Sequence, residues 1–174
     1  IEVEWAHFPL HSETPDEGLA LAELFAGRGF DLDEMYTKMK GLMDDEGLPY
    51  GKRSHTYNSR LAQELGKWVD TLGFGDAFHD VMFRAYFVDG KNIAEIDTLV
   101  DLAVGVGLHE GETRDVLTGR LFKEQVDADW QRSRDYGITG VPTFVSSGQG
   151  LVGAQPYESL EKFVLAQGAS KRSA

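Results

Sequence analysis

The spacing of hydrophobic positions changes along the chain. Ile1, Val3 and Trp5 alternate with two glutamates, which is the period-two pattern of a β-strand with one apolar face. From about Leu19 to Tyr136 the apolar residues instead recur every three or four positions, as in amphipathic helices. The clearest runs are Leu61, Leu65, Trp68, Val69 and Leu72; Phe74, Phe78, Val81, Met82 and Ala85; and Ile96, Leu99, Val100 and Ala103.

The pattern changes again near the C-terminus. Thr143–Val145 forms a short β-type run that follows Pro142, and after a glycine-rich turn Leu151–Val152 resumes it. These two runs predict a β-hairpin. Residues 155–167 predict a final amphipathic helix, and residues 168–174 form a polar tail that we expect to fray. The predicted inward side of that helix consists of Tyr157, Leu160, Phe163 and Val164.

Local polar residues indicate where helices begin. Asp31 lies three residues before Glu34, and Asn92 three before Glu95, as in pairs that cap helix N-termini. The segment 57–60 also begins a helix. Its polar side chains either cap that helix or contact a substrate, and capping is the favoured interpretation.

Composition restricts the function classes. The 174 residues carry a net charge of −12 and a pI near 4.7, which argues against nucleic acids and anionic membranes as partners. No apolar run approaches the length of about 20 residues that a membrane span needs. The absence of cysteine excludes a structural disulfide and a thiolate metal site, and the five histidines lack metal-site spacing.

Several motifs resemble one known family. Gly140-Val141-Pro142-Thr143-Phe144-Val145, followed by Gly153-Ala154-Gln155-Pro156, resembles the proline turn and hairpin of thioredoxin-type proteins. The first fifteen residues and the run from Tyr57 to Trp68 resemble DsbA-type oxidoreductases of the FrnE-like branch, as do Phe83–Phe87 and Tyr136–Pro142. The resemblance is collinear over nearly the whole chain.

The resemblance implies an α/β fold. We expect a thioredoxin-like part at residues 1–18 and 135–174, and an inserted all-helical domain at residues 19–134. In the family, a first strand, a Cys-x-x-Cys motif and a first helix precede the stretch that matches Ile1. That first strand would lie between Ile1–Trp5 and Thr143–Val145, so these two strands are not expected to be direct neighbours. Without it, we expect the chain to be poorly stable, prone to dimerise or swap, or else completed by a segment outside these 174 residues.

The resemblance also implies a substrate site. A cis Val141–Pro142 bond, flanked by Gly140 and Thr143, would bind an extended substrate, and His11 would lie in a loop near the same face. No residue of this chain replaces the dithiol, because disulfide exchange needs a thiolate. We therefore expect no catalytic residue and no metal ligand within this sequence.

Three functions remain open at this stage. The first is a bacterial, cytoplasmic disulfide oxidoreductase without a cofactor, acting on protein or small-thiol substrates, with its dithiol upstream of Ile1. The second is a glutathione-dependent enzyme similar to hydroxychromene-carboxylate isomerases or kappa-type glutathione transferases. The third is a non-catalytic peptide-binding module. The resemblance also allows a homodimer. A Cys-x-x-Cys upstream of Ile1 supports the first function, whereas a lone Ser or Cys there supports the second.

Overall fold

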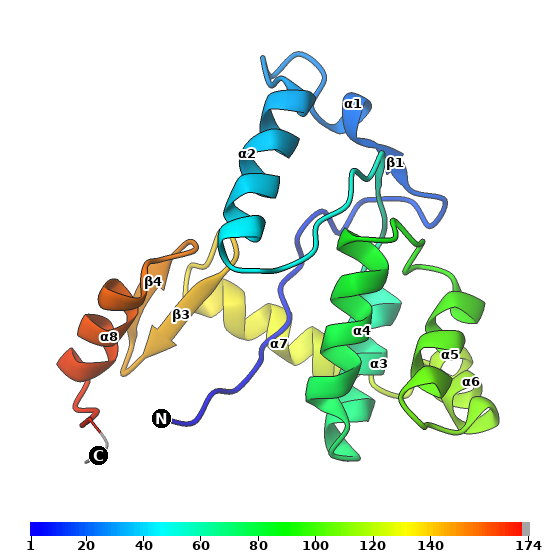
Figure 1. Ribbon diagram of the computed structural model, residues 1–174. Coiled ribbons are helices and arrows are strands. Elements are labelled where there is room, and N and C mark those ends of the chain that lie inside the picture. Colours follow the sequence, from blue (N-terminus) through cyan, green and yellow to red (C-terminus); the bar gives the residue numbers. More distant parts are fainter. Residues whose placement is uncertain (172–174) are drawn as a thin grey trace. The chain divides into compact units, whose positions relative to one another are not determined.

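The computed structural model describes residues 1–171, and these divide into two compact units (Figure 1). Unit 1 consists of residues 1–10 together with the chain from Asp127 onward, and unit 2 consists of residues 11–126. The polar tail predicted to fray falls partly on residues 172–174, which lie outside the described residues.

Unit 2 is mainly helical. Its helices α3 and α4 pack side by side, α5 pairs with α6, and α3 also contacts α6 (Figure 1). The elements are β1 (Leu19–Ala20), α1 (Leu21–Leu24), α2 (Leu32–Asp45), β2 (His55–Thr56), α3 (Arg60–Thr71), α4 (Gly75–Phe87), α5 (Ile96–Gly105) and α6 (Glu110–Thr118). Helix α7 (Lys123–Asp135) begins in unit 2 and continues into unit 1.

The core of unit 2 forms from the helical runs that the sequence shows. Leu65, Val69, Phe78 and Leu99 are almost completely buried in one cluster. They occupy the inward positions of α3, α4 and α5, because residues three or four apart share one face of a helix. Gly73 follows α3 with φ of 79°, a conformation that a side chain disfavours, and it ends that helix.

Unit 2 is not all-helical, so that part of the prediction was wrong. Strands β1 and β2 pair antiparallel, with Leu19 opposite Thr56 and Ala20 opposite His55. The Leu21 N–H group also donates to the Ser54 carbonyl at 2.9 Å, which extends the contact by one residue. A pairing of two residues leaves no periodicity in the sequence, which is why hydrophobic spacing could not predict it.

Unit 1 contains the predicted hairpin and final helix. Strand β3 (Thr143–Ser146) pairs antiparallel with β4 (Gln149–Val152), and α8 (Tyr157–Ala166) follows. The turn between the strands has φ of 48° at Ser147 and 75° at Gly148, and positive values at both central positions favour a tight hairpin. Tyr157 was predicted to face inward, but it is 71% exposed.

The Ile1–Trp5 strand was also predicted wrongly. These residues have no regular structure, and Ile1, Val3 and Trp5 are all exposed. Their alternation fits a strand, but a strand needs a partner for its backbone groups. Neither sheet of the described residues includes this segment, so it also does not neighbour Thr143–Ser146.

The boundaries of the units differ from the expected ones. The predicted divisions after residues 18 and 134 lie several residues later than the observed divisions after Leu10 and Val126. The reason is that α7 contacts the N-terminal segment of unit 1. The His7 N–H group donates to the Asp129 carboxylate at 2.8 Å, and Arg132 forms an ion pair with Glu4 at 2.9 Å.

Candidate functional site

The Val141–Pro142 peptide bond is cis, which is the isomer that the sequence analysis expected. The bond lies immediately before β3. The Thr143 hydroxyl donates to the Gly140 carbonyl at 2.7 Å, which holds the turn that leads into β3. Gly140, Val141, Pro142 and Thr143 are therefore held together at one end of the hairpin.

Strand β3 has a free edge on the side away from β4. The Gly153 N–H group donates to the Pro142 carbonyl at 2.8 Å, so these two residues form a hydrogen-bonded pair. Pairs alternate in an antiparallel ladder, and the next pair, Thr143 with Val152, is therefore a non-bonded one. The backbone N–H and C=O groups of Thr143 and Val145 consequently point away from β4.

No other strand of the described residues pairs with this edge, because each sheet has only two strands. The side chains nearby are partly apolar and accessible. Val141 is 50% exposed, and Phe144 and Val145 are each more than one-third exposed. The edge can thus accept the backbone of an extended peptide and offer it apolar contacts.

The opposite edge of the hairpin, on β4, is less available. By the same alternation, the backbone groups of Val152 point away from β3. The Val152 carbonyl already accepts a hydrogen bond of 2.7 Å from the Gln155 side chain. Neither the edge position of Val145 nor this role of Gln155 was predicted from the sequence. Val145 could have been found from the hairpin, because every second residue of a strand directs its backbone groups away from the partner strand.

One face of the hairpin borders a shallow hollow within unit 1. Residues 136–139, which connect α7 to the proline turn, form one side of it. Thr143, Val145, Gly150 and Val152 form the other side. The hollow therefore lies beside the residues of the free edge, and side chains of a bound peptide could enter it.

His11 belongs to unit 2, whereas the other predicted site residues belong to unit 1. It is exposed, with a positive φ of 55°, and its carbonyl accepts a hydrogen bond from the Thr14 N–H group at 3.0 Å. The site of unit 1 is therefore built without it.

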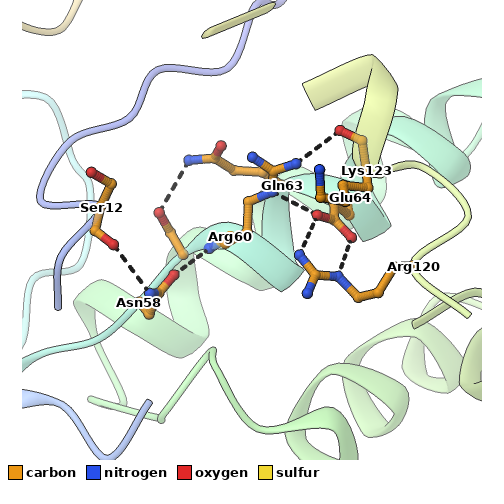
Figure 2. A network of polar contacts seen from close by, with 8 residues as sticks. Ser12, Asn58, Arg60, Gln63, Glu64, Arg120 and Lys123 are labelled. Atoms are coloured by element: carbon orange, nitrogen blue, oxygen red, sulfur yellow. Dashed lines mark hydrogen bonds and ion pairs between the residues drawn. The ribbon is translucent and has the colours of Figure 1, made fainter. Parts of the chain in front are cut away.

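The polar residues at the start of α3 form an internal network rather than an open site (Figure 2). The Asn58 side chain accepts from the Arg60 N–H group at 2.9 Å and donates to the Thr14 carbonyl at 2.8 Å. The side-chain amide of Gln63 donates to the Ser59 hydroxyl at 3.1 Å. Ser59 is the N-cap residue of α3 but makes no side-chain capping hydrogen bond, so the predicted capping is provided only by Asn58, which accepts from the first N–H group of the helix.

Glu64 is the buried centre of that network. Its side chain lies between Arg60 and Arg120, which donate to its carboxylate at 2.6–2.7 Å (Figure 2). Arg60 also donates to the Lys123 carbonyl at 2.8 Å. Burial raises the pKa of the carboxyl, but the hydrogen bonds from Arg120 and Arg60 outweigh it, and the pKa of Glu64 is lowered. With its oxygens occupied, Glu64 stabilises unit 2 rather than providing chemistry.

The described residues contain no group of three or more His, Cys, Asp or Glu side chains placed to hold a metal ion. None of their helices combines the length and the apolar character that crossing a membrane requires.

The chain is similar in sequence to a known protein family and to a protein of Bacillus subtilis. A family model described as a DSBA-like thioredoxin domain matches residues 1–164. The uncharacterized protein YwbO of Bacillus subtilis (strain 168) is 31% identical over 111 residues, which are 63% of this chain. The match spans 55% of YwbO, little more than half of its length.

Solved structures show the same fold. The structure of a probable DsbA oxidoreductase, SCO1869 from Streptomyces coelicolor, matches with a TM-score of 0.80 and 27% identity. That match covers 94% of this chain and 74% of the other. The cytosolic disulfide reductase DsbM from Pseudomonas aeruginosa matches with a TM-score of 0.55 and 22% identity. It covers 78% of this chain and 76% of the other, and at that identity it shows a shared fold only.

Proposed function

The chain belongs to the DSBA-like thioredoxin domain family and has its fold, and from this premise we propose that the protein is a FrnE-like thiol–disulfide oxidoreductase acting on polypeptides. In this proposal the edge of β3, with Gly140, Val141, Pro142 and Thr143 at its start, binds the substrate. Residues outside the 174 of this sequence supply the dithiol. A cytoplasmic location is part of the proposal, and the structural likeness to the cytosolic disulfide reductase DsbM supports it.

The free edge of β3 is the observation that carries the binding role. An extended segment that adds to this edge would pair with Thr143 and Val145 through backbone hydrogen bonds, which do not depend on the substrate sequence. Such pairing suits an enzyme that acts on many polypeptides. The exposed Val141 side chain and the hollow beside β3 would add apolar contacts.

The proposed reaction needs two thiols. A thiolate attacks one sulfur of the substrate disulfide, a mixed disulfide forms, and the other substrate sulfur leaves as a thiolate. The second thiol then attacks the mixed disulfide, which releases the reduced substrate and leaves the dithiol oxidised. The residues of this chain hold the substrate in place during both steps. They supply neither electron.

Peptide binding to this chain can be tested without the dithiol. We expect a short, unstructured peptide with serine in place of cysteine to shift the amide resonances of Thr143 and Val145. Val145→Pro should abolish these shifts, because it removes an outward N–H group that the ladder does not use. Val152→Pro is the matched control on the other edge and should retain them. Equal binding by both variants would exclude the edge of β3 as the peptide site.

Glutathione is the second candidate substrate. The Pseudomonas enzyme DsbM has also been solved with GSH, which is the observation that favours it. If glutathione is the substrate, the tripeptide should shift the resonances of Val141 and Thr143, and longer peptides should bind no better. If polypeptides are the substrate, binding should strengthen as the peptide lengthens along β3.

A further inference from the structure

The hollow of unit 1 lies against one face of the hairpin. Thr143 is opposite Val152, and Val145 is opposite Gly150. Opposite residues share a face of a sheet, as do residues two apart, so all four belong to the same face. They line the hollow, which has a volume of about 120 Å³. Its other wall is the connection from the end of α7 to the proline turn, residues 136–139 (Figure 1).

The connecting wall is fixed to α7. The Ile138 N–H group donates to the Ser133 carbonyl at 2.9 Å, and the Gly137 N–H group donates to the Arg134 carbonyl at 2.9 Å. Gly137 has a φ of 66°, in the left-handed region. Together these features make up a Schellman motif, in which a glycine ends a helix. Ile138 lines the hollow, so its position there is set by the end of α7.

The described residues that line the hollow are all uncharged. Between Asp135 and Glu158 the sequence has no acidic, basic or histidine residue, although 26% of the chain is charged. A charged side chain that entered the hollow would lose contacts with water without gaining an ion pair. An aliphatic side chain would instead bury apolar surface against Val145 and Val152, which are 39% and 62% exposed. The hollow therefore favours an uncharged, apolar group.

Gly150 leaves the hollow open. A Cβ at this position would meet no atom within 4 Å, and the backbone there is outside the left-handed region that favours glycine. A larger side chain at this position would therefore occupy the hollow without strain. An apolar cavity of about 150 Å³ holds a benzene molecule. The hollow is somewhat smaller and has room for one aliphatic side chain.

A peptide paired with β3 would direct side chains towards the hollow. Successive side chains of a strand point to opposite faces of a sheet, so every second side chain would lie on the face of Thr143 and Val145. Diagonal neighbours on adjacent strands are about 7–8 Å apart, a separation that long side chains span. A leucine of the peptide would therefore reach the hollow, whereas an alanine would not.

We propose that this hollow is a specificity pocket, which selects polypeptide substrates that carry an aliphatic side chain beside the segment paired with β3. Backbone pairing alone does not depend on the substrate sequence. The hollow adds a preference at one substrate position. It is filled only when the peptide backbone lies along β3, so this role rests on the proposed function.

The probe is a labelled peptide of about seven residues, the length of an ordinary strand, with serine and threonine around one central leucine. The uniform flanks let the central residue choose its register along β3. Two control peptides carry alanine or asparagine at the centre, and asparagine has nearly the shape of leucine. Binding to the 174-residue chain is measured by fluorescence anisotropy. We expect the leucine peptide to bind about five- to tenfold more tightly than the alanine peptide.

The asparagine peptide should bind no more tightly than the alanine peptide, because its amide would be buried without a partner. Equal affinities of the leucine and asparagine peptides would overturn the proposal. All three peptides are uncharged at the centre, so the acidity of the chain does not separate them.

Two variants locate the pocket. Gly150→Leu fills the hollow and should reduce the preference for leucine over alanine to less than about twofold. Ser146→Leu is the matched control, because Ser146 is opposite Gln149 and adds the same side chain to the other face of β3. It should retain the wild-type preference. An unchanged preference in Gly150→Leu would refute the hollow as the pocket.

Magnetisation transfer between the methyl groups of the peptide leucine and those of Ile138 gives a readout in the wild type that needs no variant. We expect these nuclear Overhauser effects with the leucine peptide bound, and their absence would contradict the proposal. Equal binding of all three peptides, with shifted amide resonances at Thr143 and Val145, would overturn the pocket and leave the proposed function in place. No shift at Thr143 and Val145 with any peptide would overturn both.

Discussion

Glu64 illustrates how a single residue contributes to unit 2. Its charge is accommodated in the interior by two arginines, and removing the carboxylate takes an ion-pair partner from both of them. We expect Glu64→Gln to lower the free energy of unfolding by about 3 kcal/mol, the lower end for a buried pair, because Arg120 is 42% exposed.

The measurement is urea unfolding followed by far-UV circular dichroism. Glu110→Gln is the matched control, because Glu110 pairs with Arg114 at the surface, where both side chains are exposed. This control should lose less than about 1 kcal/mol. Equal losses in the two variants would mean that the interior network does not stabilise the protein.

The lowered pKa of Glu64 also predicts a pH dependence. Because the folded pKa lies below the ordinary value of 4.5, the stabilisation is fully present above that value and is lost as the pH falls through the folded pKa. We expect wild-type stability to fall in acid more steeply than that of Glu64→Gln, so that the two curves converge. Parallel curves below the ordinary pKa would contradict the lowered pKa.

Residues with local roles were predictable from the sequence. Asp31 caps α2 through the N–H groups of Asp33 and Glu34, as its spacing indicated. Asn92 also contacts Glu95, but as part of a turn that precedes α5. The burial of Glu64 was not predictable, because its two partners include Arg120, which lies 56 residues away in the sequence.

Among the elements, the helices followed their hydrophobic spacing most closely. Leu99 is fully buried on α5, whereas Val104 on the same helix is 46% exposed. We expect Leu99→Ala to destabilise the protein by about 2–5 kcal/mol through the cavity it leaves, measured by thermal or urea unfolding.

Val104→Ala is the control for Leu99→Ala on the same helix, and it should change stability by no more than about 0.5 kcal/mol. A small loss of stability in Leu99→Ala together with a large one in Val104→Ala would show that the buried and exposed faces of α5 are the reverse of those assigned.

The strands were harder to predict than the helices. Residues 1–5 have the right alternation but no partner, and β1 and β2 are too short to show a pattern.

For the whole molecule, the sequence indicated a thioredoxin-like fold, and the family and the fold agree with that prediction. The candidate site was predicted only in part. The proline turn was identifiable from its residues, whereas the free edge at Val145 depends on the hairpin register. That edge also affects stability. Unpaired backbone groups at the edges of a two-stranded sheet cost free energy if they are buried, and they can pair with another chain if they are exposed.

A peptide that pairs with β3 should therefore stabilise unit 1. We expect the 174-residue chain to melt at a higher temperature with an excess of the serine-substituted peptide than without it, because the peptide would satisfy the outward backbone groups of Thr143 and Val145. Val145→Pro should show no such increase. An equal increase in the wild type and in Val145→Pro would contradict pairing along β3.

The rate of disulfide exchange by the protein together with its dithiol segment tests the central claim most directly. With an external dithiol present to reduce the oxidised protein after each turnover, we expect reduction of an oxidised peptide. Val145→Pro should show a raised KM and a nearly unchanged kcat, because this variant loses substrate pairing and keeps the thiols. Val152→Pro should retain the wild-type KM. An absence of exchange in the folded, dithiol-containing protein, or equal KM values in the two variants, would contradict the account.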